Sequence, residues 1–364
     1  MSKRLFGVFV LSLAIATALA GCGGGGKKQQ NTSGPVDLSN RSLYITTIAG
    51  TGIEPDSSNT DIDGDNCPAL NANIQPSNIT LDREGNIYFV DGSAIRKIDK
   101  SGIITRIAGQ SIAGPCQNNI KAIDAYLFNP KEIVFDNNGN LYVTDSDNSC
   151  VRKIDKSGII TTYVGPQDDA TIKFELIQPW GLAIDSSGNL YISDANGSIN
   201  SVFKVSASGN VTTIASNTTG ADFRSPCSLT IDPAGNLYVV DAIHHCIKKI
   251  TPSGNISIVA GNGTLDNNSD GGLATEAKLG ILSQIATDPY GNLYICDTSN
   301  HCIRKISPSG IITTVIGTNG EAGYAGDNGL ADQALLLFPY GIAVDSNTNF
   351  YICDTGNFRI RVAK

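Results

Sequence analysis

Apolar residues occur along the chain in short runs that are rich in Ile, Val and Tyr and bounded by Asp, Asn, Ser, Pro and Gly. Such runs predict β-strands joined by tight turns, with almost no helix. Most positions within a run are apolar rather than alternating, as expected when a sheet packs on neighbours through both faces. In one stretch the pattern predicts four successive strands, called a to d, at residues 132–136, 140–145, 151–155 and 159–164.

One motif, represented by GNLYICDTSNHCIRKI at residues 291–306, occurs six times. An aspartate ends the predicted strand b of each copy, and these residues are Asp91, Asp145, Asp194, Asp241, Asp297 and Asp354. Successive copies are 54, 49, 47, 56 and 57 residues apart, a period typical of a four-stranded propeller blade. Because the aspartate recurs in every copy, we interpret it as scaffold that hydrogen-bonds in its own b–c turn rather than as a catalytic acid.

The two ends of the repeat region are complementary. Residues 42–50 have the pattern of a strand d without the three strands that should precede it, whereas the last repeat ends after strand c. The N-terminal strand must therefore complete the last blade, which closes the ring and removes both sheet edges. The sequence thus predicts an all-β fold over residues 42–364: a six-bladed β-propeller of four-stranded antiparallel blades.

The last repeat carries the motifs of a known family. PYGIAVD at 339–345, followed by NFYICDTGNFRIRV, resembles the NHL repeat. Four connections between blades share an Ala-x-x-Ala core that predicts one helical turn and resembles the inserts of teneurin-type NHL repeats. These are ALNANI (69–74), AIDAYL (122–127), ATEAKL (274–279) and ADQALL (331–336). The resemblance implies a six-bladed propeller but no single activity, because binding proteins and enzymes both occur on such folds.

The N-terminus resembles a bacterial lipoprotein signal. A basic start and a short apolar stretch lead to Leu-Ala-Gly-Cys, which predicts a signal peptide over residues 1–21 and lipidation of Cys22. A secretory peptide with a chance cysteine is the alternative. Residues 22–41 are polar and glycine-rich, as in a flexible tether. Gly23 follows the cysteine where inner-membrane lipoproteins often carry Asp, so we expect a lipid anchor in the outer membrane or at the cell surface of the bacterial envelope.

Charge and cysteine content narrow the function. The formal net charge of −8 disfavours a nucleic-acid partner, because phosphate binding needs an excess of Lys and Arg. Besides Cys22 there are eight cysteines, an even number that permits disulfides in an oxidising compartment. Cys116 and Cys150 are expected to serve the same blade, in its d–a and b–c connections, and they are the leading disulfide candidate.

The start of strand a departs most from the repeat. The family consensus has Gly at its third position because six strands crowd the axis, yet three blades carry Asn, Glu or Gln there. Lys131 precedes this position in the blade that carries Glu132, and Trp180 and Tyr340 precede it in two blades that keep the glycine. The candidate ligand-binding residues are Asn78, Lys131, Glu132, Trp180, Gln284 and Tyr340. Polar groups among aromatic side chains around a central mouth are typical of a small-molecule or peptide site, and a solvated rim without a ligand is the alternative.

One acidic insert raises the question of calcium. TDIDGDN at 60–66 places Asp61, Asp63 and Asp65 at alternate positions, as in the first half of a calcium loop. The distal bidentate Glu of an EF-hand is missing, so an acidic surface loop without an ion is the alternative. We predict no other cofactor.

We call the face that carries the d–a connections and the b–c loops the top face. The sequence predicts a lipid-anchored scaffold that binds a protein, peptide or small molecule through this face without chemistry. The alternative is a metal-assisted lactonase or lyase with its site at the central top mouth, as on related propellers. An RNA-binding role is disfavoured by the negative charge.

Overall fold

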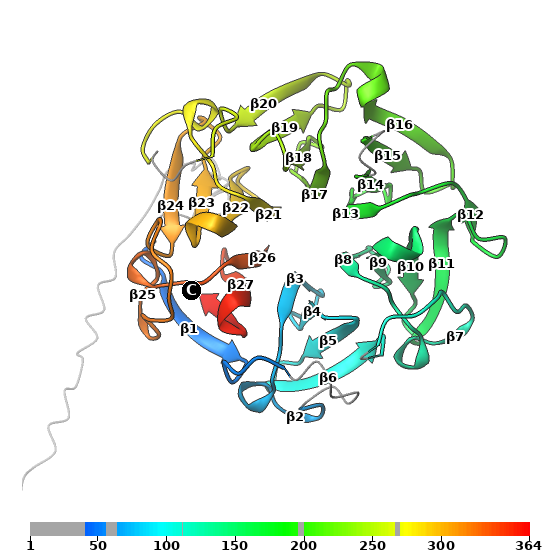
Figure 1. Cartoon of the computed structure of the whole chain (residues 1–364), viewed down its shortest axis with the longest axis horizontal. Coiled ribbons are helices and arrows are strands. Elements are labelled where there is room, and N and C mark those ends of the chain that lie inside the picture. Colours follow the sequence, from blue (N-terminus) through cyan, green and yellow to red (C-terminus); the bar gives the residue numbers. More distant parts are fainter. Residues whose placement is uncertain (1–40, 56–63, 111, 196–199, 266–269) are drawn as a thin grey trace, which may run out of the picture. The chain divides into compact units, whose positions relative to one another are not determined.

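A computed structural model describes residues 41–55, 64–110, 112–195, 200–265 and 270–364. Six antiparallel sheets surround a central axis, with strand a innermost in each (Figure 1). The prediction of an all-β, six-bladed β-propeller is confirmed. The predicted signal peptide, Cys22 and all of the tether except residue 41 lie outside the described residues. Among those described, none belongs to a helix with the length and apolarity needed to cross a bilayer.

The strands of each blade follow the predicted order. Blade 1 has β3 (Pro76–Leu81), β4 (Ile87–Asp91), β5 (Ala94–Ile98) and β6 (Ile103–Ala108), and blade 2 has β8 (Pro130–Phe135), β9 (Leu141–Asp145), β10 (Cys150–Ile154) and β11 (Ile159–Gly165). Blade 3 has β13 (Pro179–Ile184), β14 (Leu190–Asp194), β15 (Ser201–Val205) and β16 (Val211–Ser216), and blade 4 has β17 (Pro226–Ile231), β18 (Leu237–Asp241), β19 (Cys246–Ile250) and β20 (Ile256–Ala260). Blade 5 has β21 (Leu282–Thr287), β22 (Leu293–Asp297), β23 (Cys302–Ile306) and β24 (Ile312–Ile316), and blade 6 has β26 (Pro339–Val344), β27 (Phe350–Asp354), β28 (Arg359–Ala363) and β1 (Tyr44–Ala49).

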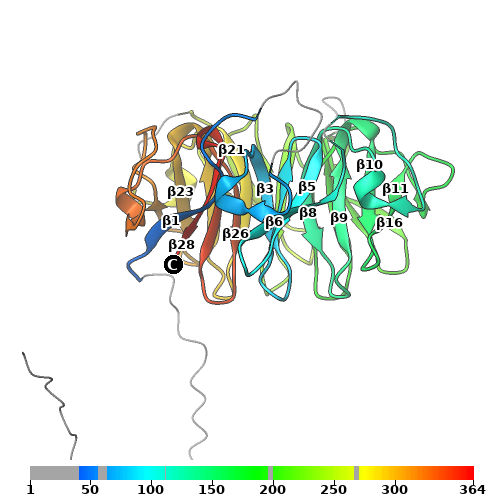
Figure 2. The same cartoon turned by 90° about the horizontal axis from the view of Figure 1, so that it is seen from below.

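Strand β1 closes the ring, as predicted. It pairs antiparallel with β28, with Ile45 opposite Ala363 and Thr47 opposite Arg361. Tyr44 and Lys364 extend the ladder, because each backbone N–H donates to the other's carbonyl at 2.9 and 3.0 Å. Figure 2 shows β1 and β28 side by side at the rim. The two ends of the propeller sequence are therefore held together in one sheet.

The Ala-x-x-Ala inserts form single helical turns, as predicted. They are the 3-10 helices η1 (Ala69–Asn71), η2 (Ala122–Asp124), η5 (Ala274–Glu276) and η7 (Ala331–Gln333). Short strands precede three of them, namely β2 (Cys67–Pro68), β7 (Ile120–Lys121) and β25 (Gly329–Leu330), and β12 (Ile172–Lys173) lies beside β11. The remaining 3-10 turns are η3 (Ser146–Asn148), η4 (Asn217–Thr219), η6 (Thr298–Asn300) and η8 (Thr355–Asn357). Strands β2, β7 and β25 pair with strand d of the blade that follows them, so each insert covers the outer edge of its own blade.

The hydrophobic core lies between blades rather than within one layer. Six clusters of buried residues occupy the six gaps between neighbouring blades. Between blades 1 and 2, for example, Val90 and Ile95 pack with Ile133 and Val143. This packing through both faces explains why the strands are apolar at most positions.

The recurring aspartates are scaffold, with one refinement. At each a–b turn, an aspartate accepts the backbone N–H and the side-chain amide of the asparagine four residues later, as Asp136 does from Asn140 at 2.8 and 2.7 Å. The aspartate that ends strand b instead accepts a backbone N–H from the connection that enters its own blade. Asp145 accepts from Phe128 at 2.6 Å, and Asp354 accepts from Leu337 at 2.8 Å. This aspartate also accepts in its own b–c turn, as expected: the Asn148 side-chain amide donates to Asp145 at 3.0 Å, and that of Asn357 donates to Asp354 at 2.9 Å.

Candidate functional site at the propeller axis

The inner edge of every strand a faces the axis, where its backbone N–H groups have no neighbouring strand to pair with. Buried N–H groups need an acceptor, and here side chains from other blades provide it. We call the four residues that do so the axial belt: Asn78, Glu132, Ser228 and Gln284. All four are buried and occupy the third position of strand a in blades 1, 2, 4 and 5.

The belt satisfies one N–H of each blade in turn. Asn78 accepts from Ile133 at 3.1 Å, and Ser228 accepts from Ile285 at 3.2 Å. Glu132 and Gln284 are longer, and each serves two blades. Glu132 accepts from Leu182 at 2.9 Å and Leu229 at 3.4 Å, while Gln284 accepts from Ile342 at 3.0 Å and Ile79 at 3.2 Å. The third position of blades 3 and 6 is glycine, and a Cβ on Gly341 would lie 3.1 Å from the Gln284 amide oxygen.

Glu132 is the acidic member of the belt, and its surroundings change its titration. Burial raises its pKa to about 7, while hydrogen bonds from the Leu182 amide and the Ser228 hydroxyl oppose the rise. The Ser228 hydroxyl donates to Glu132 Oε1 at 2.8 Å. Both carboxylate oxygens therefore accept hydrogen bonds from other blades, so the first role of Glu132 is structural. With this pKa, the group also gains or loses its proton near neutral pH.

Lys131, Trp180 and Tyr340 lie one position before the belt, on its top side. The Lys131 ammonium stands 4.5 Å from the centre of the Trp180 ring, a cation–π contact between blades 2 and 3. Burial lowers the pKa of Lys131. Burial also raises the pKa of Tyr340 to about 12, so its hydroxyl stays protonated at neutral pH. A basic group and two aromatic rings, all partly exposed, thus occupy the mouth of the axis.

Around this mouth the top face exposes large apolar side chains that the sequence did not single out. We call these five residues the apolar collar: Phe128, Ile177, Ile243, Ile281 and Phe338. Between 43% and 59% of each is exposed. They lie in the connections that enter strand a or in a b–c loop, and their backbones hold those segments together; Thr298 N–H, for example, donates to Ile281 O at 2.9 Å. Four of the five lie one or two positions before strand a, and Ile243 lies in a b–c loop, so the fold brings them to the same face.

The open space inside the ring lies on the other side of the belt. A cavity of about 260 Å³ is lined by Glu132 and Gln284 at one end and by the later residues of strand a, such as Leu81 and Val134, at the other. A space of about 470 Å³ adjoins it at the a–b turns. Of the six candidate ligand-binding residues, Glu132 and Gln284 line this cavity, whereas Lys131, Trp180 and Tyr340 face the top.

The remaining candidates are placed as follows. Asp61 and Asp63 of the predicted calcium loop lie outside the described residues, and Asp65 forms an ion pair with Arg96 at 3.0 Å. The sulfurs of Cys116 and Cys150 lie 3.1 Å apart, and both cysteines are free thiols. His301, which shares a motif with two cysteines, accepts the Phe338 N–H at 3.1 Å and stacks edge-on against that ring. It therefore supports the collar.

Fold and site define a class: a six-bladed β-propeller with an internal belt of acceptors at its axis and exposed apolar side chains on its top face. The family model for the teneurin NHL domain matches residues 28–114 and 111–174, and that for the NHL repeat matches residues 336–363. Teneurin-1 of Gallus gallus is 30% identical over 280 residues. The chain is an NHL-repeat β-propeller. The match covers 72% of this chain but 9% of that teneurin, so the chain spans a small part of its length.

Solved structures agree with this fold. An auxiliary nutrient binding protein from Bacteroides thetaiotaomicron is similar with a TM-score of 0.68 at 20% identity, over 88% of this chain and 76% of its own. Virginiamycin B lyase from Staphylococcus aureus is similar with a TM-score of 0.52 at 16% identity, over 88% of this chain and 99% of its own. At such identities the similarity shows the propeller fold alone.

Proposed function

We propose that this protein is a binding scaffold of the bacterial cell envelope, held by a lipid on Cys22, which takes a peptide, protein or small-molecule ligand on its top face. The observation that carries the proposal is the apolar collar around Lys131, Trp180 and Tyr340. Exposed apolar side chains gathered around a few polar groups are typical of binding sites. The fold similarity to a nutrient-binding protein supports a binding role.

The chemistry of the mouth suggests which ligands to try first. Aromatic rings accept flat or apolar groups, and the Lys131 ammonium favours a ligand with a carboxylate or another anionic group. Because Lys131 is partly desolvated, an anion near it would meet a stronger field than at an exposed lysine. Ligands that combine an aromatic or aliphatic body with a single negative charge are therefore the first class to test.

The single tryptophan of the chain makes the test direct, because Trp180 is the only indole that can report. The purified protein is titrated with N-acetylated hydrophobic amino acids and short peptides carrying a free carboxylate, while Trp180 fluorescence is followed. Binding at the mouth should change the emission saturably. Lys131→Ala should weaken binding about tenfold or more, which corresponds to the loss of about 1.4 kcal/mol.

The control is a variant on the opposite face. Asn347→Ala changes an exposed a–b turn and should leave the titration unchanged. If no ligand of this class alters the emission, or if Phe338→Ala and Ile281→Ala have no more effect than Asn347→Ala, the top face is not the binding site.

The anchor is tested separately: Cys22→Ser should move the protein from the membrane fraction to the soluble fraction, and an unchanged distribution would contradict lipidation.

A metal-assisted lactonase or lyase is the second candidate, and one observation favours it. Glu132 is a buried axial acid with a pKa of about 7, in the range that suits a general acid or base. The fold similarity to virginiamycin B lyase adds support. Turnover of a lactone or of virginiamycin B that disappears on chelation and in Glu132→Gln would establish the enzyme in place of the scaffold.

A further inference from the structure

A buried arginine recurs on strand c beneath the connections that enter blades 1, 2, 5 and 6. Each has no exposed surface and faces the aspartate that ends strand b; the residues are Arg96, Arg152, Arg304 and Arg361. In three of these blades a second carboxylate reaches the guanidinium from the connection itself. The pairs are Asp65 with Arg96 at 3.0 Å, Asp270 with Arg304 at 2.8 Å and Asp327 with Arg361 at 2.8 Å.

Blade 2 lacks this second charge. Asn118 lies 34 residues before Arg152, the same offset that separates Asp270 from Arg304, and its neutral Oδ1 accepts from Arg152 at 3.3 Å. In the described part of the chain, Arg152 has one ion pair, with Asp145 at 3.4 Å. The guanidinium of blade 2 therefore has one anionic partner fewer than its counterparts, in a place where charge is poorly screened by water.

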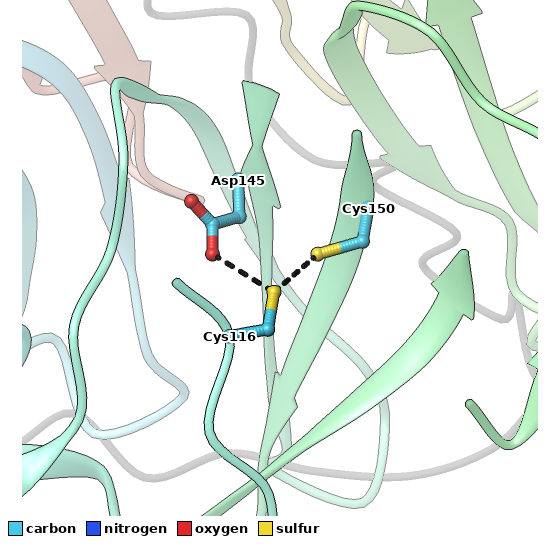
Figure 3. A group of neighbouring side chains, drawn as sticks. All are labelled: Cys116, Asp145 and Cys150. Atoms are coloured by element: carbon cyan, nitrogen blue, oxygen red, sulfur yellow. Dashed lines mark hydrogen bonds between the residues drawn. The ribbon is translucent and has the colours of Figure 1, made fainter. Parts of the chain in front are cut away.

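A thiol from the same connection lies close to this ion pair. Cys116 enters from the d–a connection and points between Asp145 and Cys150 (Figure 3). Its sulfur lies 3.1 Å from the Cys150 sulfur and 3.7 Å from an Asp145 oxygen. A hydrogen bond from the Cys150 thiol and the charge of Arg152 lower the pKa of Cys116, whereas Cys116 and burial raise the pKa of Cys150. Cys116 is half-buried and Cys150 is fully buried, so only Cys116 can meet an external reagent first.

We propose that Cys116 and Cys150 form a thiol–disulfide exchange site, with Cys116 as the attacking thiolate, Cys150 as the resolving thiol, and Arg152 and Asn118 as positioning residues. Cys116 attacks a disulfide donor RSSR, which forms a mixed disulfide and releases one RS⁻. The Cys150 thiol loses its proton to solvent and attacks the Cys116 sulfur, which releases the second RS⁻. The chain is thereby oxidised by two electrons and the donor is reduced to two thiols. The resulting bond ties the connection before blade 2 to that blade.

The same three side chains fit a bound metal ion less well. The ligand atoms of Cys116, Asp145 and Cys150 lie within 4.8 Å of one another. However, Asp145 Oδ1 already accepts the Phe128 N–H, and Oδ2 accepts from Asn148 and Arg152. A guanidinium in contact with the carboxylate would repel a divalent cation, and a closed zinc site needs four ligands. The geometry therefore favours a covalent bond between the sulfurs.

The test treats the full-length reduced chain with oxidised glutathione, blocks the remaining thiols and maps the peptides. The expected product is a single new crosslink between the peptides that contain Cys116 and Cys150. It should be lost in Cys116→Ser, and oxidation should raise the melting temperature of the wild type by a few degrees. Cys302→Ser is the matched control, because Cys302 occupies the position of Cys150 in blade 5 and contacts Asn319 rather than a thiol.

A second measurement tests whether the charge around Arg152 controls the reactivity of Cys116, beyond the short distance between the two sulfurs. Asn118→Asp supplies the carboxylate that blades 1, 5 and 6 have, so the pH at which Cys116 is half-maximally alkylated by iodoacetamide should rise by about one unit. A stable glutathione adduct on Cys116 without the crosslink, or an unchanged alkylation profile in Asn118→Asp, would overturn the proposal. So would one equivalent of tightly bound Zn²⁺ that protects both thiols from alkylation.

Discussion

Side-chain length at a single position of strand a determines how many blades one residue can join. Asn78 has a short side chain and serves the N–H of the next blade only. Glu132 and Gln284 are one methylene longer than Asn78, and each accepts N–H groups from two blades. Blades 3 and 6 can therefore have glycine at this position without leaving an N–H group unpaired at the axis. The departures from the glycine consensus are therefore explained first by the N–H groups around the axis.

Glu132 should make the stability of the protein depend on pH. Its pKa rises from 4.5 in the unfolded chain to about 7 in the folded one, so between these values the folded state holds the extra proton. The free energy of unfolding contributed by this group is thus greatest below pH 4.5 and falls as pH rises through 7, by on the order of 3 kcal/mol. Glu132→Gln should remove this fall, because Gln284 shows that an amide can accept two such N–H groups.

The measurement is the free energy of unfolding of wild type and Glu132→Gln in urea at several pH values from 5 to 8. The difference between the two proteins isolates Glu132 from the buried aspartates, such as Asp354, whose pKa is also raised. The free energy of unfolding of the variant should increase relative to that of the wild type as the pH rises from 5 to 8. Parallel curves for the two proteins would show that Glu132 is ionised in the folded state throughout.

At the scale of the strand, the covering inserts determine how deeply the outer edges are buried. Ile104, Ile160, Ile312 and Ile45 hold the same position of strand d in blades 1, 2, 5 and 6, and none has exposed surface. Each of these blades has an insert along its edge. In blade 4 the corresponding residue is Ile256, which is 37% exposed, and the described residues place no strand beside the outer edge of β20.

A matched pair of substitutions tests this difference. Ile312→Lys places an ammonium beneath the insert of blade 5 and should lower the free energy of unfolding by about 3 kcal/mol or more. Ile256→Lys places it at an open edge and should cost less than about 1 kcal/mol, while reducing self-association through that edge. Urea unfolding and light scattering provide the two readouts. Equal losses of stability would mean that the β20 edge is covered after all.

The features that recur from blade to blade could be predicted from the sequence, whereas the contacts that depend on the register between neighbouring blades could not. Strands, Ala-x-x-Ala turns and ring closure follow from local patterns that occur several times, and all were confirmed. The belt was half visible: Asn78, Glu132 and Gln284 stood out because they replace glycine, but Ser228 lies in the same column and was passed over. Which N–H each would accept from depends on how neighbouring strands are offset at the axis. The collar was missed although four of its five residues lie one or two positions before strand a, because their exposure depends on how the connections fold.

At the scale of the whole molecule, the stability of the ring depends on blade 6, whose strands come from both ends of the propeller sequence. Blade 6 takes three strands from the end of the chain and its outer strand β1 from the beginning, so its formation requires closure of the entire propeller. Ile45 of β1 is fully buried in the cluster between blades 5 and 6. The contacts of this residue therefore contribute to the cooperativity of the ring as well as to one blade.

A charge at this position should open the ring. Ile45→Asp buries a carboxylate with no partner and should lower the free energy of unfolding by about 4 kcal/mol or more. Tyr44→Asp is the matched control, because Tyr44 is the next residue along β1, is 56% exposed, and should tolerate the charge within about 0.5 kcal/mol. Hydrogen exchange should show β28 and β27 losing protection first in Ile45→Asp, since β28 then has no partner on its outer side. If protection is lost evenly around the ring, or first in a blade distant from β1, closure by this strand does not limit the stability of the propeller.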